Sequence, residues 1–122
     1  MEIARVIPQL RTTDLAASIA FYTELLGFTL EFQYGDFYAA VRTGPHVVHL
    51  KLVDEPDPSI AYVERQEHLH LYVETPDVAG LAAELERKGV KLLRGVHDTD
   101  WGTRECAVKD DQGHTLYFGE LR

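Results

Sequence analysis

The chain has 122 residues, of which 45% are hydrophobic and 26% are charged, and its formal net charge is −8. This length fits one domain that can bury a core without disulfides. The acidic balance argues against nucleic acids and anionic membrane surfaces as partners, because both repel negative charge. No apolar run approaches the roughly 20 residues of a membrane span, and the first residues lack a secretory-signal pattern, so we expect a cytoplasmic protein.

The first half of the chain predicts a strand, a helix and three further strands. Residues 3–12 alternate loosely and favour a strand. A helix follows, which Thr13 or Asp14 caps and Gly27 ends, because glycine tolerates the left-handed conformation at a helix end. The apolar stripe of this helix consists of Leu15, Ile19, Tyr22 and Leu26. The next strands are predicted at residues 28–34, 37–43 and 46–53.

The second half repeats this order. A strand at 67–73 leads into a helix for which Thr75 is the expected cap and Pro76 the first helical position. The buried stripe of the helix consists of Val78, Leu81 and Leu85. Short strands follow near residues 90–93, 103–109 and 114–120.

The repetition of strand, helix and three strands indicates a pseudo-twofold fold. Between the halves, residues 54–59 hold two prolines and three acids, which disfavour both strand and helix. We therefore expect one α+β domain over residues 1–122. Its parts are module one at 3–53, a linker at 54–65 and module two at 66–122.

Alternation along the strands separates apolar from polar side chains. One face, with Leu10, Leu50 and Leu116, has to pack on the helices. The opposite face is rich in histidine and tyrosine, which suit a half-buried pocket; the alternative is the wet face of antiparallel sheets. This second face is predicted to hold Gln9, Arg11, His49, Lys51, His68, His70, Tyr72, Thr115 and Tyr117.

Several short motifs occur in a characteristic order: Leu10 to Leu15, Phe21-Tyr22, Leu25 to Phe28, His68 to Val73, Trp101 to Glu105 and Asp110 to His114. In this order and spacing the chain resembles the vicinal oxygen chelate superfamily, which contains glyoxalase I, bleomycin-resistance proteins, fosfomycin-resistance enzymes and ring-cleaving dioxygenases. The resemblance implies two tandem βαβββ modules whose mixed sheets form a cup, in a homodimer. Some relatives swap the first strand between protomers around a proline. Pro8 is a candidate for that role, and the alternative is an ordinary edge-strand proline.

The resemblance also implies four symmetric strand positions that hold a divalent ion in enzymes of the superfamily. By alignment these positions are Ile7, His49, His68 and Tyr117. Isoleucine cannot bind a metal, and tyrosine has a reference pKa near 10, so only His49 and His68 remain as ligands. A catalytic ion usually has at least three protein ligands. We therefore expect no cofactor and no catalytic residue.

The pattern favours the metal-free branch similar to bleomycin-resistance proteins, which bind a drug and sequester it without chemistry. One alternative is a metal-dependent lyase, isomerase or dioxygenase, in which His49, His68, His70 and Glu105 hold Zn, Ni, Mn or Fe. Another is a protein whose dimer surface serves a macromolecule. Whether the chain is an enzyme stays open at this point.

A small-molecule ligand is expected to stack on Trp101, with Phe37 and Tyr38 as the opposing wall. Trp101 could instead cap the end of the sheet, and Glu105 could instead form an ion pair. Acidic residues would favour a cationic ligand such as bleomycin, whereas Arg11 and Lys51 would favour an anion. The predicted ligand-binding set is Gln9, Arg11, Phe37, Tyr38, His49, Lys51, His68, His70, Trp101, Glu105 and Tyr117.

Three further histidines and the single cysteine are assigned to other environments. His46, His97 and His114 lie near predicted turns and are expected to be exposed. Cys106 shares strand parity with Val108, which predicts a small core residue and not a nucleophile.

Overall fold

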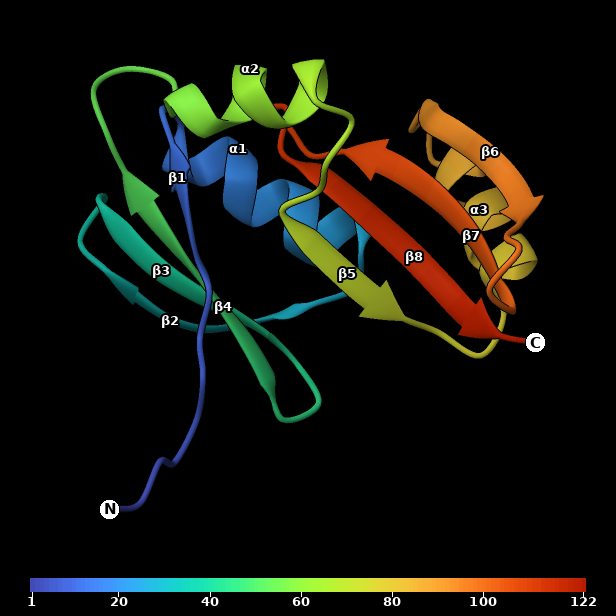
Figure 1. The fold of residues 1–122 in the computed structure, drawn as a ribbon. Coiled ribbons are helices and arrows are strands. Elements are labelled where there is room, and N and C mark those ends of the chain that lie inside the picture. The colour runs from blue at the N-terminus through green and yellow to red at the C-terminus, as the bar shows by residue number, and fades with distance from the viewer. The chain divides into compact units, whose positions relative to one another are not determined.

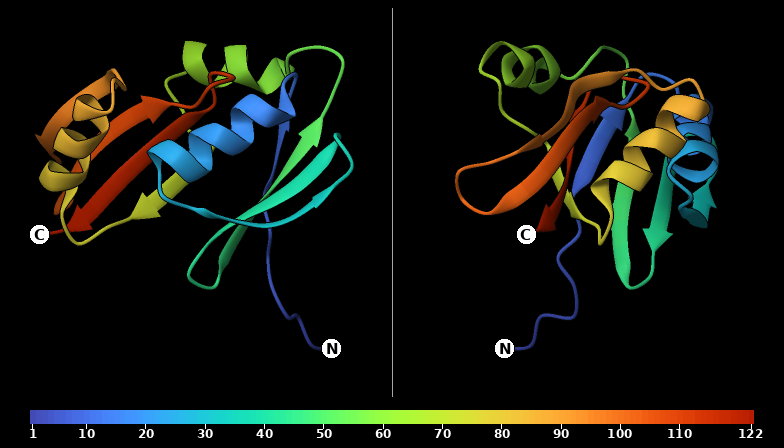
Figure 2. Two further views of the ribbon diagram at one scale, coloured as in Figure 1. Left: turned by 180° about the vertical axis from the view of Figure 1, so that it is seen from behind. Right: turned by 90° about the vertical axis from the view of Figure 1, so that its right-hand side faces the viewer.

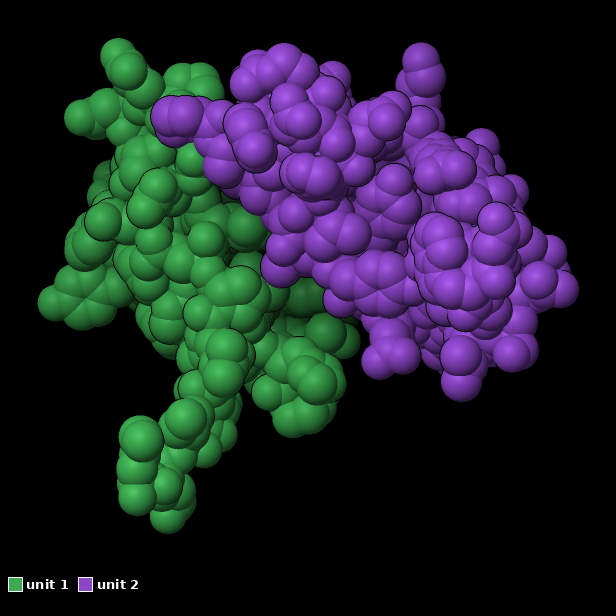
Figure 3. Space-filling model, in the orientation of Figure 1, with its two compact units in different colours: residues 1–57 green, residues 58–122 purple.

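The computed structural model describes residues 1–122 and divides them into two compact units. Unit 1 is Met1–Asp57 and unit 2 is Pro58–Arg122 (Figure 3). Each unit contains its own four-stranded mixed sheet, so the chain has the expected α+β class (Figure 1). None of the helices combines the length and the apolar character needed to cross a bilayer.

Unit 1 has a strand, a helix and three strands, as the sequence predicts. Its elements are β1 (Gln9–Thr12), α1 (Leu15–Ala20), the π-helical turn η1 (Phe21–Leu25), β2 (Thr29–Tyr34), β3 (Tyr38–Thr43) and β4 (His46–Leu52). The sheet order is β1-β4-β3-β2; β1 is parallel to β4 and the other pairs are antiparallel. The strand expected at residues 3–12 is therefore confined to its last four residues.

Local signals account for the helix of unit 1. The Asp14 carboxylate caps α1 by accepting a hydrogen bond from the Ala17 amide at 3.0 Å, which satisfies one of the unpaired amides of the first turn. The chain then leaves the helix through Gly27, whose φ of +76° only glycine adopts readily. α1 packs on β3 and β4, and its Leu15 and the Tyr22 of η1 are buried there.

Unit 2 repeats this arrangement and adds one helix. Its elements are α2 (Pro58–Arg65), β5 (Leu71–Glu74), α3 (Val78–Arg87), β6 (Leu92–Asp98), β7 (Thr103–Lys109) and β8 (Thr115–Leu121). The sheet order is β5-β8-β7-β6, with β5 parallel to β8. α3 packs against β6, β7 and β8 (Figure 2).

Helix α2 is the main departure from the predicted secondary structure. It occupies residues that were expected to form a linker, because Pro58 stands at the first helical position, where proline is well tolerated. After α2 the chain needs several residues before it enters the sheet, so β5 begins at Leu71 and not at residue 67. His68 and His70 therefore lie before the strand in which they were predicted.

Two smaller corrections also concern unit 2. The cap of α3 is Asp77, whose carboxylate accepts from the Gly80 amide at 3.0 Å, and not Thr75. β6 extends to Asp98, well beyond the predicted end at residue 93, and it pairs with β7 through two register shifts. The bulges explain why simple alternation did not reveal the full strand.

Candidate functional site

Strand pairing in unit 1 places the predicted polar residues on one face of the sheet. Gln9 pairs with His49 and Arg11 with Lys51, while their neighbours Leu10 and Leu50 are buried on the helix side. We call the face opposite the helix side the unit 1 open face. By register it holds Gln9, Arg11, Thr29, Phe32, Tyr34, Tyr38, Ala40, Arg42, Val47, His49 and Lys51.

A chain of hydrogen bonds crosses this face from β1 to β4. The side-chain amide of Gln9 donates to the hydroxyl of Tyr38 at 2.9 Å. The same hydroxyl lies 2.9 Å from Nδ1 of His49. Where the Tyr38 hydroxyl donates to Nδ1, the neutral imidazole carries its proton on Nε2. The imidazole then offers an N–H donor away from Tyr38.

Aromatic rings surround this hydrogen-bonded chain. Phe32 lies parallel to Tyr38 with a centroid distance of 6.5 Å, and it meets His49 edge-on at 5.6 Å. Phe37 contacts both Tyr34 and Tyr38 edge-on. Phe32, Tyr34 and Phe37 are 43%, 69% and 46% exposed, so a large apolar area faces outward here. Sequence reasoning missed Phe32 and Tyr34, although their alternation in the strand predicted at 28–34 was a usable signal.

In unit 2 the corresponding open face, opposite α3, holds a carboxylate at its centre, that of Glu105. Glu105 is only 5% exposed, and its Oε2 accepts from the Tyr72 hydroxyl at 2.6 Å and the Thr103 hydroxyl at 3.0 Å. Tyr72 pairs with Tyr117 on this face, and Glu105 pairs with Gly119. A Cβ added to Gly119 would overlap the Tyr72 hydroxyl, so glycine is needed for the phenol to reach Glu105.

These contacts change the acidity of the phenol. Burial, together with the hydrogen bond to Glu105 and its negative charge, raises the pKa of Tyr72 to about 12. Tyr72 therefore stays protonated and donates to Glu105 over the whole physiological range. This pairing was not predicted; Glu105 was expected either to face a ligand or to form an ion pair.

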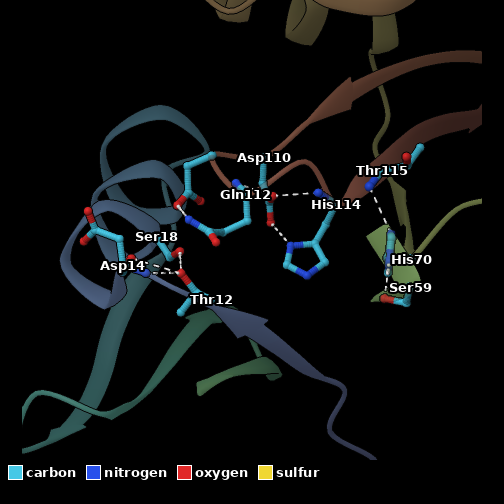
Figure 4. Close-up of polar contacts among 10 residues, drawn as sticks. Thr12, Asp14, Ser18, Ser59, His70, Asp110, Gln112, His114 and Thr115 are labelled. Carbon is cyan, nitrogen blue, oxygen red and sulfur yellow. Dashed lines mark hydrogen bonds and ion pairs between the residues drawn. The ribbon is translucent and has the colours of Figure 1, made fainter. Parts of the chain in front are cut away.

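His70 is committed to a structural role at the start of β5 (Figure 4). The backbone amide of Thr115 donates to its Nδ1 at 3.1 Å, and the Ser59 hydroxyl lies 3.1 Å from its Nε2. A backbone amide can only donate, so Nδ1 is unprotonated and the neutral ring carries its proton on Nε2. Both ring nitrogens are thus used in joining α2, β5 and β8.

His114 was expected to be exposed, but it is only 1% exposed. Its Nδ1 lies 2.8 Å from Oδ2 of Asp110, and its backbone amide donates to Oδ1 of the same carboxylate at 2.9 Å (Figure 4). The ring meets His70 edge-on at 4.8 Å. The turn between β7 and β8 folds back so tightly that the side chain enters the interior.

The four positions that the resemblance relates to metal ligands lie in different settings. Ile7 precedes β1, and the β1 residue that pairs with His49 is Gln9. His68 is exposed before β5, and the β5 residue that pairs with Tyr117 is Tyr72. No group of three or more His, Cys, Asp or Glu side chains that could hold an ion occurs in the structure.

The remaining predicted residues have varied surroundings. Trp101 is 73% exposed in the turn before β7. Asp98 is paired with Arg104 at 2.8 Å and with Arg122 at 3.3 Å, and the Arg104 hydrogen bond holds the pKa of this carboxyl below its usual value. Cys106 is fully buried, as predicted, and burial followed by the charge of Glu86 raises the pKa of its thiol to about 11.

Comparisons with known proteins agree on one family. Residues 3–118 match the model of the Glyoxalase/Bleomycin resistance protein/Dioxygenase superfamily. An uncharacterized protein of Mycolicibacterium smegmatis is 36% identical over 110 residues, which cover 89% of this chain and 86% of the relative.

Solved structures share the fold over almost the whole chain. TnmS3, an antibiotic binding protein from Streptomyces sp. CB03234, has a TM-score of 0.76 at 26% identity and covers 100% of this chain and 99% of its own. The bleomycin-binding protein of bleomycin-producing Streptomyces verticillus, solved with copper(II)-bleomycin, has a TM-score of 0.73 at 23% identity and coverages of 97% and 96%. Lactoylglutathione lyase from Agrobacterium tumefaciens has a TM-score of 0.74 at 17% identity and coverages of 96% and 92%.

Proposed function

Since the chain belongs to the Glyoxalase/Bleomycin resistance protein/Dioxygenase superfamily, we propose that it is a metal-free binding protein that sequesters a small aromatic molecule of the antibiotic type. The observation that carries this proposal is the unit 1 open face. There Gln9, Tyr38 and His49 form a hydrogen-bonded chain, and exposed aromatic rings surround it. Such a combination of apolar area with a few fixed polar groups is typical of small-molecule sites.

The residue types at the aligned positions support a site without metal. Of these four positions, Ile7 cannot bind an ion, Tyr117 is a phenol, and only His49 and His68 are imidazoles. The His49 imidazole is already engaged through Nδ1, and the nearby phenols are poor ligands at neutral pH. Sequestration needs none of these groups to bind an ion.

Two of the similar structures support a drug as the ligand. TnmS3 is an antibiotic binding protein, and the Streptomyces verticillus protein binds bleomycin. A bleomycin-like antibiotic is therefore one ligand to test, beside flat polycyclic antibiotics. We also propose that the protein is a cytoplasmic homodimer, which light scattering behind a sizing column would test. A swapped first strand would keep the pairing of β1 with β4 and exchange only the protomer that supplies it.

The alternative is a metal-dependent lyase, isomerase or dioxygenase. Glu105 is the carboxylate that such an enzyme could place on an open face. Both Tyr72 and Thr103 donate to the same oxygen of Glu105, however, and His70 uses both of its nitrogens in the protein. Within the atypical set of His49, His68, His70 and Glu105, His70 would have to give up one of its two bonds to reach an ion.

One experiment separates the two functions. The protein is purified without a histidine tag, its content of Zn, Ni, Mn and Fe is measured, and each metal is added back in a thermal-shift assay. Binding stabilises a protein in proportion to the logarithm of ligand concentration over dissociation constant, so an antibiotic panel in the same assay reports the ligand. We expect stabilisation by an aromatic antibiotic and none by metals.

The opposite result would overturn the proposal. The contrary result is about one equivalent of metal per chain that is lost in His49→Ala or His68→Ala but kept in the exposed control His46→Ala. It would show that these histidines coordinate a bound metal. If no aromatic compound in the panel stabilises the protein, the proposal that it sequesters such a compound is wrong.

A further inference from the structure

We infer that the unit 1 open face selects ligands in which a flat aromatic ring system carries a negative charge, such as an aryl carboxylate or an ionised phenol. This inference rests on the proposed function and names the ligand class of the same site. It departs from the cationic, bleomycin-like ligand that acidic residues in the sequence had favoured.

The first step is the charge of the face itself. Its paired residues include three bases, Arg11, Arg42 and Lys51, and no carboxylate, while Glu31, the unpaired bulge residue of β2, lies 3.8 Å from Arg5. The chain as a whole has a net charge of −8, so this face is opposite in sign to the molecule. A local patch of one sign raises the concentration of oppositely charged ligands beside it.

The second step is the availability of these charges. Arg42 donates to the Gly44 carbonyl at 3.1 Å at one end of the sheet, and Arg11 lies 3.6 Å from Asp57. Lys51 is exposed and has no ion pair. Its strand partner in β3 is Tyr38, so its ammonium belongs to the same part of the face as the aromatic rings. Lys51 is therefore the base that can pair with a ligand.

The third step concerns the acids that would favour a cation. Asp98 is paired with two arginines, and Glu105 is buried and accepts hydrogen bonds from two hydroxyls. Both charges are thus already engaged within unit 2, and the third acid, Asp100, is exposed in the turn before β7 and not on the unit 1 open face. Of the two opposing tendencies in the sequence, the basic one belongs to the unit 1 open face.

The fourth step is the hydrogen-bond donor that accompanies the charge. When Tyr38 donates to Nδ1 of His49, Nε2–H is a donor, and an oxyanion or carbonyl oxygen is its natural acceptor. Phe32 and Phe37 supply ring surfaces beside it. A flat anion could therefore stack on a ring while its oxygen accepts from His49 and pairs with Lys51.

Three probes with one ring system test the inference. Anthracene substituted on its central ring with a carboxylate, a hydroxymethyl or an aminomethyl group offers an anion, a neutral compound and a cation of nearly the same shape. Fluorescence titration at low and at physiological salt gives the three dissociation constants. We expect the carboxylate to bind about tenfold more tightly than the alcohol, with a difference that shrinks as salt screens it, and the amine to bind most weakly.

A matched pair of variants assigns the preference to this face. Lys51→Gln should weaken carboxylate binding about five- to tenfold, as for a hydrogen-bonded charge pair, and leave the alcohol unchanged. Lys91→Gln removes the same charge from an exposed lysine of unit 2 and should change neither. Equal affinities for the three probes would overturn the anion preference, and so would equal effects of the two variants. In either case the probes still bind through their rings, so the proposed function survives. If no probe binds and the antibiotic panel is also silent, both proposals fail.

Discussion

Asp110 holds His114 by two bonds at once: one carboxylate oxygen accepts from the histidine amide at 2.9 Å, and the other lies 2.8 Å from Nδ1. Both side chains are almost fully buried. The same carboxylate also accepts from the backbone amide of Gln112 at 3.0 Å. The turn between β7 and β8 is thus organised around one buried acid, and the ring that it orients lies against His70.

This relationship predicts a marked loss of stability in Asp110→Asn. Asparagine has one acceptor oxygen in place of two, so the His114 ring loses the carboxylate oxygen that its Nδ1 faces, and the cost should be about 1–3 kcal/mol in the free energy of unfolding. Urea denaturation followed by circular dichroism measures it. Asp100→Asn, at an exposed position in the turn between β6 and β7, should change the free energy of unfolding by less than about 0.5 kcal/mol. A similar effect of both variants would contradict a specific role of Asp110.

Glycine at position 119 is expected to be essential for the Tyr72–Glu105 contact. Gly119→Ala places a methyl group where the phenol lies, and such overpacking costs about 1–3 kcal/mol. In a Tyr72→Ala background the same substitution should cost clearly less, because the clashing ring is gone. Gly95→Ala is the control, since a Cβ there meets nothing within 4 Å. Additive costs in the double variant would show that the two residues do not interact.

Tyr72 should titrate later than an ordinary tyrosine. Its pKa of about 12 lies above the reference value near 10, so the folded state keeps a proton that the unfolded state has lost. The stabilising contribution is complete below pH 10 and disappears as the pH rises toward 12. Ultraviolet difference titration of the wild-type protein against Tyr72→Phe isolates this phenol. Glu105→Gln should bring its pKa down toward the ordinary value, and an unchanged titration would rule out Glu105 as a cause.

The Tyr38 hydroxyl is expected to matter for binding more than for folding. Tyr38→Phe keeps the ring but leaves His49 without the partner that orients it, so affinity for the anthracene carboxylate should fall several-fold, the equivalent of about 1 kcal/mol. Unfolding should change by less than about 1 kcal/mol, because the contact is only partly buried. Tyr62→Phe, whose side chain is 53% exposed on α2 of unit 2, serves as the control. Equal losses in both variants would mean that the hydroxyl of Tyr38 has no special function.

The thiol of Cys106 should resist modification while the protein is folded. Complete burial and a pKa raised to about 11 leave almost no accessible thiolate at neutral pH. Reaction with a disulfide reagent, monitored by absorbance, should therefore proceed at the rate of unfolding. In guanidinium chloride the same thiol should react at once, and rapid reaction in native buffer would refute the assignment to the core.

The sequence was most informative where periodicity decides the structure. Alternation in β1 and β4 correctly separated Gln9 and His49 from Leu10 and Leu50, because a strand side chain has only two sides to occupy. It failed where the backbone departs from regular pairing. Helix α2 delayed β5, so His68 and His70 left the predicted face, and the bulges of β6 concealed its length. The hydrogen bonds of Glu105 and the burial of His114 depend on tertiary packing, which strand parity does not report.

The alternation in the unit 1 sheet has a practical consequence. Ala39, Val41, Val48 and Leu50 belong to the core on the helix side of β3 and β4, and Tyr38, His49 and Lys51 lie on the opposite side. A combinatorial library that varies only Gln9, Tyr38, His49 and Lys51 would therefore leave the packed layer untouched. Natural selection or laboratory evolution could therefore change the ligand specificity of such a protein without first reducing its stability.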